Sequence, residues 1–217
     1  WIEIPLCFLS AAVLLVIAND VRISDAAISI IDSADGLVLL FFFMIFLAYN
    51  FHVSKSGESI EKVTVKQLPL YLSLLFILGG LALLVLGGRF IVYNAVRFAS
   101  RLGISERIIA LTIVSIGTSL PELATSVVAA KKKNVDIAIG NVVGSNIFNV
   151  FFILGVSAVV APVPVEPLAI MDMTMNILGS MLLFIFVFTG KGRKIERWEG
   201  LSLLLLYGVY VSLLIAQ

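Results

Sequence analysis

The chain has 217 residues, of which 60% are hydrophobic and 13% are charged, and its formal net charge is +1. Such a composition excludes an ordinary soluble domain, and the near-neutral charge with scattered basic residues argues against a nucleic-acid-binding surface. The apolar residues come in runs of the length that crosses a bilayer as a helix, about 20 residues, so we predict an all-α polytopic membrane protein embedded in the lipid bilayer.

Seven transmembrane helices are predicted from apolar runs that are separated by charge, glycine and proline. In chain order they cover residues 2–18, 35–53, 69–95, 105–130, 136–161, 167–189 and 198–215. The polar stretch 54–68 is predicted to be a linker that divides residues 1–53 from residues 69–217.

The loops predict the orientation of these helices, because short cytoplasmic loops collect Lys and Arg. The loops at 54–67, 131–133 and 191–197 hold ten of the 15 Lys and Arg residues. We therefore place these loops and the linker in the cytoplasm and the C-terminus outside. The protein is expected to be a multi-pass component of the plasma or inner membrane.

A short internal repeat links the second and the last predicted helix. The second predicted helix begins with Asp35-Gly36-Leu37-Val38-Leu39-Leu40. The last predicted helix begins with Glu199-Gly200-Leu201-Ser202-Leu203-Leu204 and enters the membrane from the opposite side. Such an inverted repeat is common in transporters. We interpret residues 1–53 as the last two helices of one half and residues 69–217 as the whole second half, with the front of the first half missing before Trp1.

Glu122 is the feature most suggestive of function, because it lies within the apolar run 108–130, where a charge is costly. Pro121 precedes it and cannot donate a backbone hydrogen bond to Gly117, so the helix should open there. Carbonyl groups opened at this depth are tolerated only against protein or a wet cavity, and they bind cations in transporters. A protonated glutamate beside a simple packing kink is the alternative.

Two polar helical faces accompany this break. Steps of four, three and four place one set of side chains on a single face: Ser115, Ser119, Glu122 and Ser126. Steps of four in the next helix align Asn141, Ser145 and Asn149 among small residues, a pattern that could also be a packing seam. A carboxylate with hydroxyl, amide and carbonyl oxygens suits Na⁺ and Ca²⁺. Zinc or copper would call for His or Cys, and the chain has only His52 and Cys7.

These two helices resemble the sodium/calcium exchangers of the cation/calcium antiporter superfamily. Gly117 to Glu122 is similar to the family signature Gly-Thr-Ser-x-Pro-Glu, and Gly140 to Asn149 is similar to the signature Gly-Asn-x-x-Gly-Ser-Asn-Ile-Phe-Asn. The resemblance implies a ten-helix fold of two inverted halves with one alpha repeat each. This chain would supply the fourth to tenth helices, with the second alpha repeat at about 103–155.

The resemblance also implies roles for individual residues. Glu122 would bind calcium and sodium in competition, Ser119 and Ser145 would offer hydroxyl groups, and Thr118 and Ser115 would offer backbone carbonyls. Asn149 matches a further site position at which some relatives carry Asp, and Asn141 offers another amide oxygen. A glutamate rather than an aspartate at 122 favours an exchanger that does not need potassium. The transported ions Na⁺ and Ca²⁺ are the only ligands expected, without a cofactor.

A second Pro-Glu break, expected from the first alpha repeat, does not occur in this sequence. We therefore expect half of an ion site, to be completed by N-terminal helices of the same protein or by a second, antiparallel chain. A proton/calcium or other cation exchanger and a non-transporting membrane subunit stay open as alternatives. An enzyme is not expected, because the sequence lacks a convincing catalytic constellation.

Overall fold

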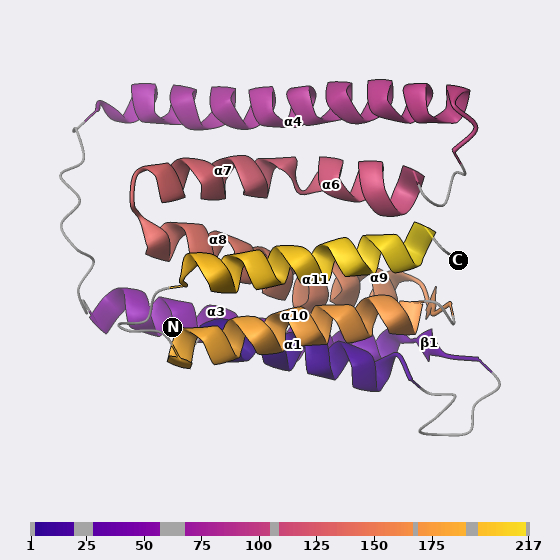
Figure 1. Cartoon of the computed structure of the whole chain (residues 1–217). Coiled ribbons are helices and arrows are strands. Elements are labelled where there is room, and N and C mark those ends of the chain that lie inside the picture. The colour runs from indigo at the N-terminus through magenta and orange to yellow at the C-terminus, as the bar shows by residue number, and fades with distance from the viewer. Residues whose placement is uncertain are drawn as a thin grey trace. The chain divides into compact units, whose positions relative to one another are not determined.

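The computed structural model describes residues 3–19, 28–56, 68–104, 109–166, 169–189 and 195–215. The described residues are mainly helical (Figure 1). In chain order the elements are α1 (Glu3–Ile17), β1 (Ile30–Ile31), α3 (Ser33–Ser56), α4 (Leu70–Arg101), η1 (Ala110–Val114), α6 (Ser115–Thr118), α7 (Leu120–Lys131), α8 (Val135–Ile147), η2 (Phe148–Leu154), α9 (Gly155–Val160), β2 (Val163–Pro164), α10 (Ala169–Thr189) and α11 (Arg197–Ile215). The two η segments are π-helical.

The predicted all-α membrane fold is confirmed, and each of the seven predicted segments is helical where it is described. Four helices are long and apolar enough to cross a membrane, at 33–55, 70–101, 135–160 and 169–189, and the bent pair α6 and α7 could form a fifth span. The apolar α1 is shorter, at 15 residues. Of the predicted cytoplasmic loops at 54–67 and 191–197, residues 57–67 and 191–194 lie outside the described residues.

The predicted end of the third segment at residue 95 is wrong, because α4 continues to Arg101. Its last turn closes with bonds from the Ile104 N–H to the Ala99 carbonyl (3.2 Å) and from the Gly103 N–H to the Ser100 carbonyl (3.1 Å). Gly103 has a φ of 75°, the left-handed conformation that ends helices and that glycine adopts without strain. The stop signal is therefore this glycine and not the polar residues before it.

The chain forms two compact units, which are described separately. Unit 1 contains residues 1–58 and 139–208, and unit 2 contains residues 59–138 and 209–217. The first two helices thus pack with the later half of the second polar helix and with α10. The predicted division of the chain into inverted halves at the linker stays a prediction.

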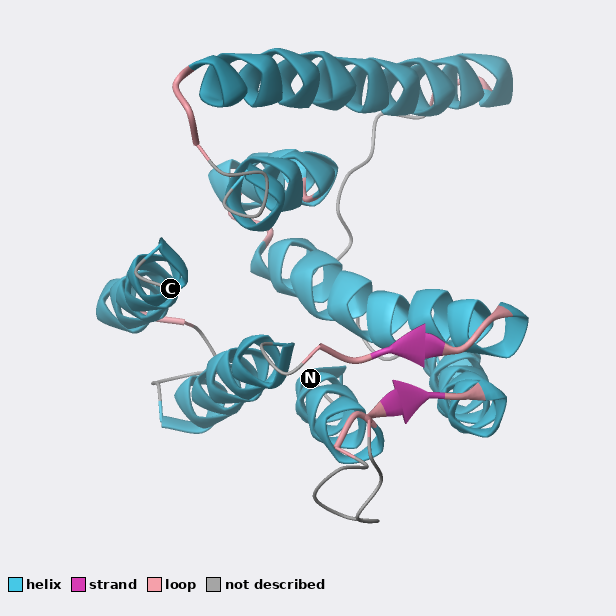
Figure 2. Ribbon diagram, turned by 90° about the vertical axis from the view of Figure 1, so that its right-hand side faces the viewer, coloured by secondary structure: helices cyan, strands magenta, loops and turns pink. Residues whose placement is uncertain are grey.

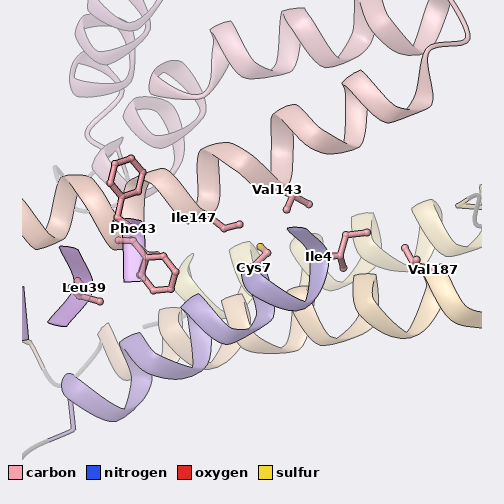
Figure 3. Close-up of a cluster of buried hydrophobic side chains, with 9 residues drawn as sticks. Ile4, Cys7, Leu39, Phe43, Val143, Ile147 and Val187 are labelled. Atoms are coloured by element: carbon pink, nitrogen blue, oxygen red, sulfur yellow. The ribbon is translucent and has the colours of Figure 1, made fainter. Parts of the chain in front are cut away.

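The core of unit 1 is an apolar cluster contributed by α1, α3, α8, η2 and α10. Figure 3 shows part of it, and its buried members are Ile4, Cys7, Leu39, Phe43, Val143, Ile147, Val150, Phe151 and Val187. Aromatic rings join α3 to η2, with ring centroids 5.3 Å apart for Phe42 and Phe151 and 4.9 Å apart for Phe43 and Phe152. These ring contacts fix α3 along the π-helical segment of the second polar helix.

Glycines bring α3 and α9 into backbone contact. A Cβ atom on Gly36 would lie only 2.7 Å from the Gly155 carbonyl oxygen, so no larger residue fits there. Beyond this contact, β1 and β2 pair antiparallel, with Ile30 opposite Pro164 and Ile31 opposite Val163 (Figure 2). The chain segments before α3 and after α9 are therefore held side by side.

The two copies of the predicted internal repeat have the same local structure at their start. In α3, Asp32 Oδ1 accepts hydrogen bonds from the N–H groups of Ala34 (2.7 Å) and Asp35 (3.0 Å), and Asp35 Oδ2 accepts one from the Asp32 N–H (3.1 Å). In α11, Glu199 Oε2 accepts a hydrogen bond from the Glu196 N–H (2.6 Å). Asp35 and Glu199 thus both cap their helix from its third residue.

Candidate cation-binding site

The first polar helix is broken at the predicted position. The helix α6 ends at Thr118, α7 begins at Leu120, and the two axes differ by 56° (Figure 1). Pro121 lies in the first turn of α7, where proline is tolerated because the N–H groups of that turn have no helical acceptor. At the break the Ser119 N–H bonds to the carbonyls of Ser115 (3.3 Å) and Ile116 (3.1 Å). The predicted opening before Glu122 is confirmed.

Both polar helices also contain a π-helical segment, η1 in the first and η2 in the second, which the sequence analysis did not predict. The segment η1 directly precedes Ser115, and η2 contains Asn149. The extra residue in a π-helical turn is energetically unfavourable and recurs at functional sites. Hydrophobicity patterns do not contain a signal for it, because both segments are as apolar as the α-helices around them.

Glu122 lies in the first turn of α7. Its side chain is half-buried and its Oε2 atom is buried. The first turn of a helix presents unpaired N–H groups and the positive end of the helix dipole, which stabilise a nearby carboxylate. The break therefore places the single carboxylate of this helix where its negative charge costs least.

The other predicted site residues of unit 2 lie just before the break. The side chains of Ser115, Thr118 and Ser119 are exposed. The Thr118 hydroxyl donates a hydrogen bond to the Ser115 carbonyl at 2.9 Å. A carbonyl oxygen has two lone pairs, so Ser115 keeps the capacity for a second ligand.

Ser126, the last member of the predicted polar face, lies beyond the bend on α7. Its hydroxyl donates to the Ala138 carbonyl on α8, at 3.4 Å. Between these helices, Lys133 has a φ of 60°, and the Asn134 side chain accepts a bond from the Ile137 N–H at 3.3 Å. A tight turn thus joins α7 to α8, and the hydrogen bond from Ser126 is a further contact between the two helices.

The remaining predicted site residues, Asn141, Ser145 and Asn149, belong to unit 1. Asn141 and Ser145 are half-buried and Asn149 is exposed. The Ser145 hydroxyl donates to the Val142 carbonyl of its own helix at 3.0 Å. Asn149 lies on η2, so its direction relative to Ser145 differs from that of a residue four positions along an α-helix. Their joint ligation with the unit 2 residues stays a prediction.

Acidic and thiolate ligands do not cluster in the described part of the chain. Among those residues, no three His, Cys, Asp or Glu side chains are placed to hold a metal ion. His52 is exposed near the end of α3, and Cys7 is buried in the apolar cluster of unit 1. Among the predicted ligands on the two polar helices, Glu122 is the one carboxylate, and the others offer neutral oxygens.

Sequence reasoning missed the contact of α4 with the broken helix. Gly117 is buried, and the Val92 side chain fills the space that a Cβ atom on Gly117 would occupy. A Cβ atom on Gly88 would lie 3.6 Å from the Gly117 carbonyl oxygen. This carbonyl is the one to which Pro121 cannot donate, and it faces α4.

Comparison with known proteins places these features in one family. Residues 72–216 match the family described as sodium/calcium exchanger protein. The putative antiporter CaxA of Alkalimonas amylolytica is 34% identical over 193 residues, which are 85% of this chain and 60% of that protein. The sodium/calcium exchanger MaX1 of Methanosarcina acetivorans is 38% identical over 133 residues, 61% of this chain and 38% of that protein.

A solved structure has the same fold. The sodium-calcium exchanger NCX_Mj, in crystals soaked with Na⁺ and Sr²⁺, superposes with a TM-score of 0.74 and 32% sequence identity. The superposition covers 97% of this chain and 64% of that one. The chain thus spans less than two thirds of the length of these relatives.

Proposed function

The chain belongs to the sodium/calcium exchanger family, and on this premise we propose that it supplies one half of the ion site of an antiporter that exchanges sodium for calcium. The observation that carries the proposal is the half-buried Glu122 in the first turn after a 56° break in an apolar span. A buried carboxylate at a broken transmembrane helix is the arrangement by which transporters bind cations.

Oxygen atoms from both polar helices would bind the cation around Glu122. Ser119 and Ser145 would contribute hydroxyl groups, Thr118 and Ser115 backbone carbonyls, and the side chains of Asn141 and Asn149 amide oxygens. Calcium takes six to eight oxygen ligands of these kinds, and sodium is likewise a hard cation. The absence of soft ligands from the set disfavours transition metals.

Exchange follows from the cost of an empty site. Without a cation, the Glu122 carboxylate would be a charge inside the membrane that the α7 dipole offsets only in part, and such a state is unfavourable. Sodium ions that enter down their gradient would replace calcium, and calcium would replace sodium. The protein would therefore change its access from one side to the other while loaded, which couples the two fluxes.

The relatives are longer than this chain, and we propose that further helices of the same protein complete the site. A second carboxylate from those helices would match the double charge of calcium. Assembly of two antiparallel copies of this chain is the other route. In the proposed orientation the turn at Lys131–Lys133 and the linker face the cytoplasm, and the C-terminus is outside.

Sodium-driven uptake of radioactive calcium into proteoliposomes tests the proposal with the full-length protein. Glu122→Gln should reduce uptake to the background of empty vesicles, because the amide keeps the shape but removes the charge. Ser157→Ala is the control, since the Ser157 hydroxyl donates to the Ile153 carbonyl one turn earlier in the chain (2.8 Å) and Ser157 is not among the predicted ligands. Wild-type exchange by the Glu122→Gln variant would refute the central role of this residue.

The alternatives give different results in the same vesicles. A proton/calcium exchanger would take up calcium in response to a pH gradient without sodium. A non-transporting subunit would show no effect of sodium or calcium on its thermal unfolding, because only a ligand that binds the native state stabilises it. The 217-residue chain alone is expected to catalyse no coupled exchange.

A further inference from the structure

The backbone of the broken helix touches α4 at Gly117. The side chain of Val92 occupies the place of a Cβ atom on Gly117, and Gly88, one turn earlier on α4, faces the Gly117 carbonyl oxygen. Both contacts lie within unit 2, in which α4 packs along η1, α6 and α7. Val92 is thus a knob on α4, and Gly117 is the hole that receives it.

This contact lies on the side of α6 opposite the exposed side chain of Ser115. An α-helix turns by about 100° per residue, so Gly117 points about 200° away from Ser115, two positions earlier. The helix α4 therefore packs against α6 on the side opposite the Ser115 side chain. A displacement of α6 away from α4 would carry Ser115 and Thr118 along, because both belong to the same short helix.

The carbonyl oxygen of Gly117 also lies against α4, next to Gly88. Its regular helical donor would be residue 121, and a proline has no N–H to give. The Ser119 N–H is directed to this carbonyl as well as to those of Ser115 and Ile116, and a backbone oxygen at such a break is tolerated in a membrane where it faces protein rather than lipid. Gly88 lets the α4 backbone approach close enough to cover it, and a side chain larger than alanine would hold α4 away.

We propose that Val92 and Gly88 are positioning residues of the cation site. By filling the hole at Gly117 and covering its carbonyl, they set the position of α6, and thereby the distance of its ligands from Glu122. They do not touch the cation themselves. The inference rests on the proposed function, because it assigns these residues to the geometry of the same site.

A double-mutant cycle on the full-length protein tests the knob and its hole. The measurement is the calcium concentration that gives half of the maximal increase in unfolding temperature. Gly117→Ala adds a methyl group that overlaps Val92, so this concentration should rise about tenfold, the ratio that corresponds to an ordinary coupling energy between contacting residues. Val92→Ala alone leaves the space at Gly117 unfilled and should raise this concentration by about threefold, and the double variant, in which the added methyl group occupies that space, should lie closer to wild type than either single variant.

A second pair of variants keeps the inference testable if Gly117→Ala does not fold. Gly88→Ala should leave the calcium dependence unchanged, because its Cβ atom would be in ordinary contact at 3.6 Å. Gly88→Val adds atoms beyond that contact, so it should push α4 away and raise the half-maximal calcium concentration. Equal calcium dependence for both Gly88 variants would contradict the role of this residue.

Two outcomes separate this inference from the proposed function. Unchanged calcium dependence in Gly117→Ala, or a change that Val92→Ala does not reverse, would overturn the inference even if unfolding without ions were affected. The Glu122→Gln variant reports on the site itself and should lose the calcium response. A calcium response that survives Glu122→Gln would instead overturn the proposed function.

Discussion

Replacement of Gly36 by alanine would test the close packing of α3 on α9. The added Cβ atom would lie 2.7 Å from the Gly155 carbonyl oxygen and 2.9 Å from the Val159 amide nitrogen. Ordinary contacts begin at about 3.4 Å, and both neighbours are backbone atoms that cannot move without their helix. The helices would therefore have to separate by about 0.7 Å, the difference between 3.4 Å and 2.7 Å.

Such a separation would also loosen the ring contacts that join α3 to η2. Overpacking of this kind costs typically 1–3 kcal/mol, and the rigid neighbours place Gly36→Ala at the upper end, at about 3 kcal/mol. For a protein of this size, this loss corresponds to a fall of roughly 6–12 °C in the unfolding temperature.

The repeat supplies a matched control for this experiment. Gly200 follows Glu199 as Gly36 follows Asp35, but an added Cβ atom on Gly200 would meet nothing within 4 Å among the described residues. In the 217-residue chain, Gly200→Ala should keep or raise the unfolding temperature, because alanine is favoured over glycine in helices by about 0.5–1 kcal/mol. Equal unfolding temperatures for Gly36→Ala and wild type, measured by circular dichroism in detergent, would refute the packing argument.

Three further changes have expected results. Lys133→Gly should stabilise the protein by about 1 kcal/mol, because Lys133 has a φ of 60°, which glycine adopts without strain. Lys132→Gly should destabilise it, because Lys132 has a φ of −80°. Denaturant titrations of both variants measure these changes, and a lower stability of Lys133→Gly than of wild type would contradict the prediction. Asp32→Ala should cost about 1–2 kcal/mol, since it removes the acceptor of two N–H groups at the start of α3, and an unchanged denaturation midpoint would contradict this role. Asn149→Asp should lower the half-maximal calcium concentration in exchange assays on the full-length protein more than that for sodium, because the added charge favours the divalent ion; an equal change for both ions would argue against Asn149 as a ligand.

The sequence was sufficient to predict the helices and the break, because both depend on local chemistry. Apolar runs locate a membrane helix wherever they occur, and Pro121 removes a hydrogen bond in any environment. The helix ends were less predictable. The end of α4, six residues beyond the predicted one, depends on the left-handed conformation of Gly103, which hydrophobicity does not reveal.

The position of the π-helical segment η2 against α3 and the contact of α4 with α6 could not be predicted, because both are contacts between distant residues. In η2, Phe151 stacks on Phe42 and Phe152 lies tilted against Phe43, more than 100 positions earlier in the chain. Likewise, Gly117 must be a glycine because of Val92, and no pattern within either helix connects the two. The sequence indicated the candidate ligands of the site, but it did not indicate the residues that hold them in place.

The charge of the candidate site explains why one half of an exchanger would treat its two ions differently. Glu122 contributes one negative charge, and the positive end of the α7 dipole beside it offsets part of that charge. One carboxylate balances a sodium ion but leaves a calcium ion with about one uncompensated charge inside the membrane, which is costly. A half site with Asn149 in place of an aspartate should therefore prefer sodium. Calcium binding would then depend on a second carboxylate, which the proposal assigns to further helices of the same protein or to a second, antiparallel copy.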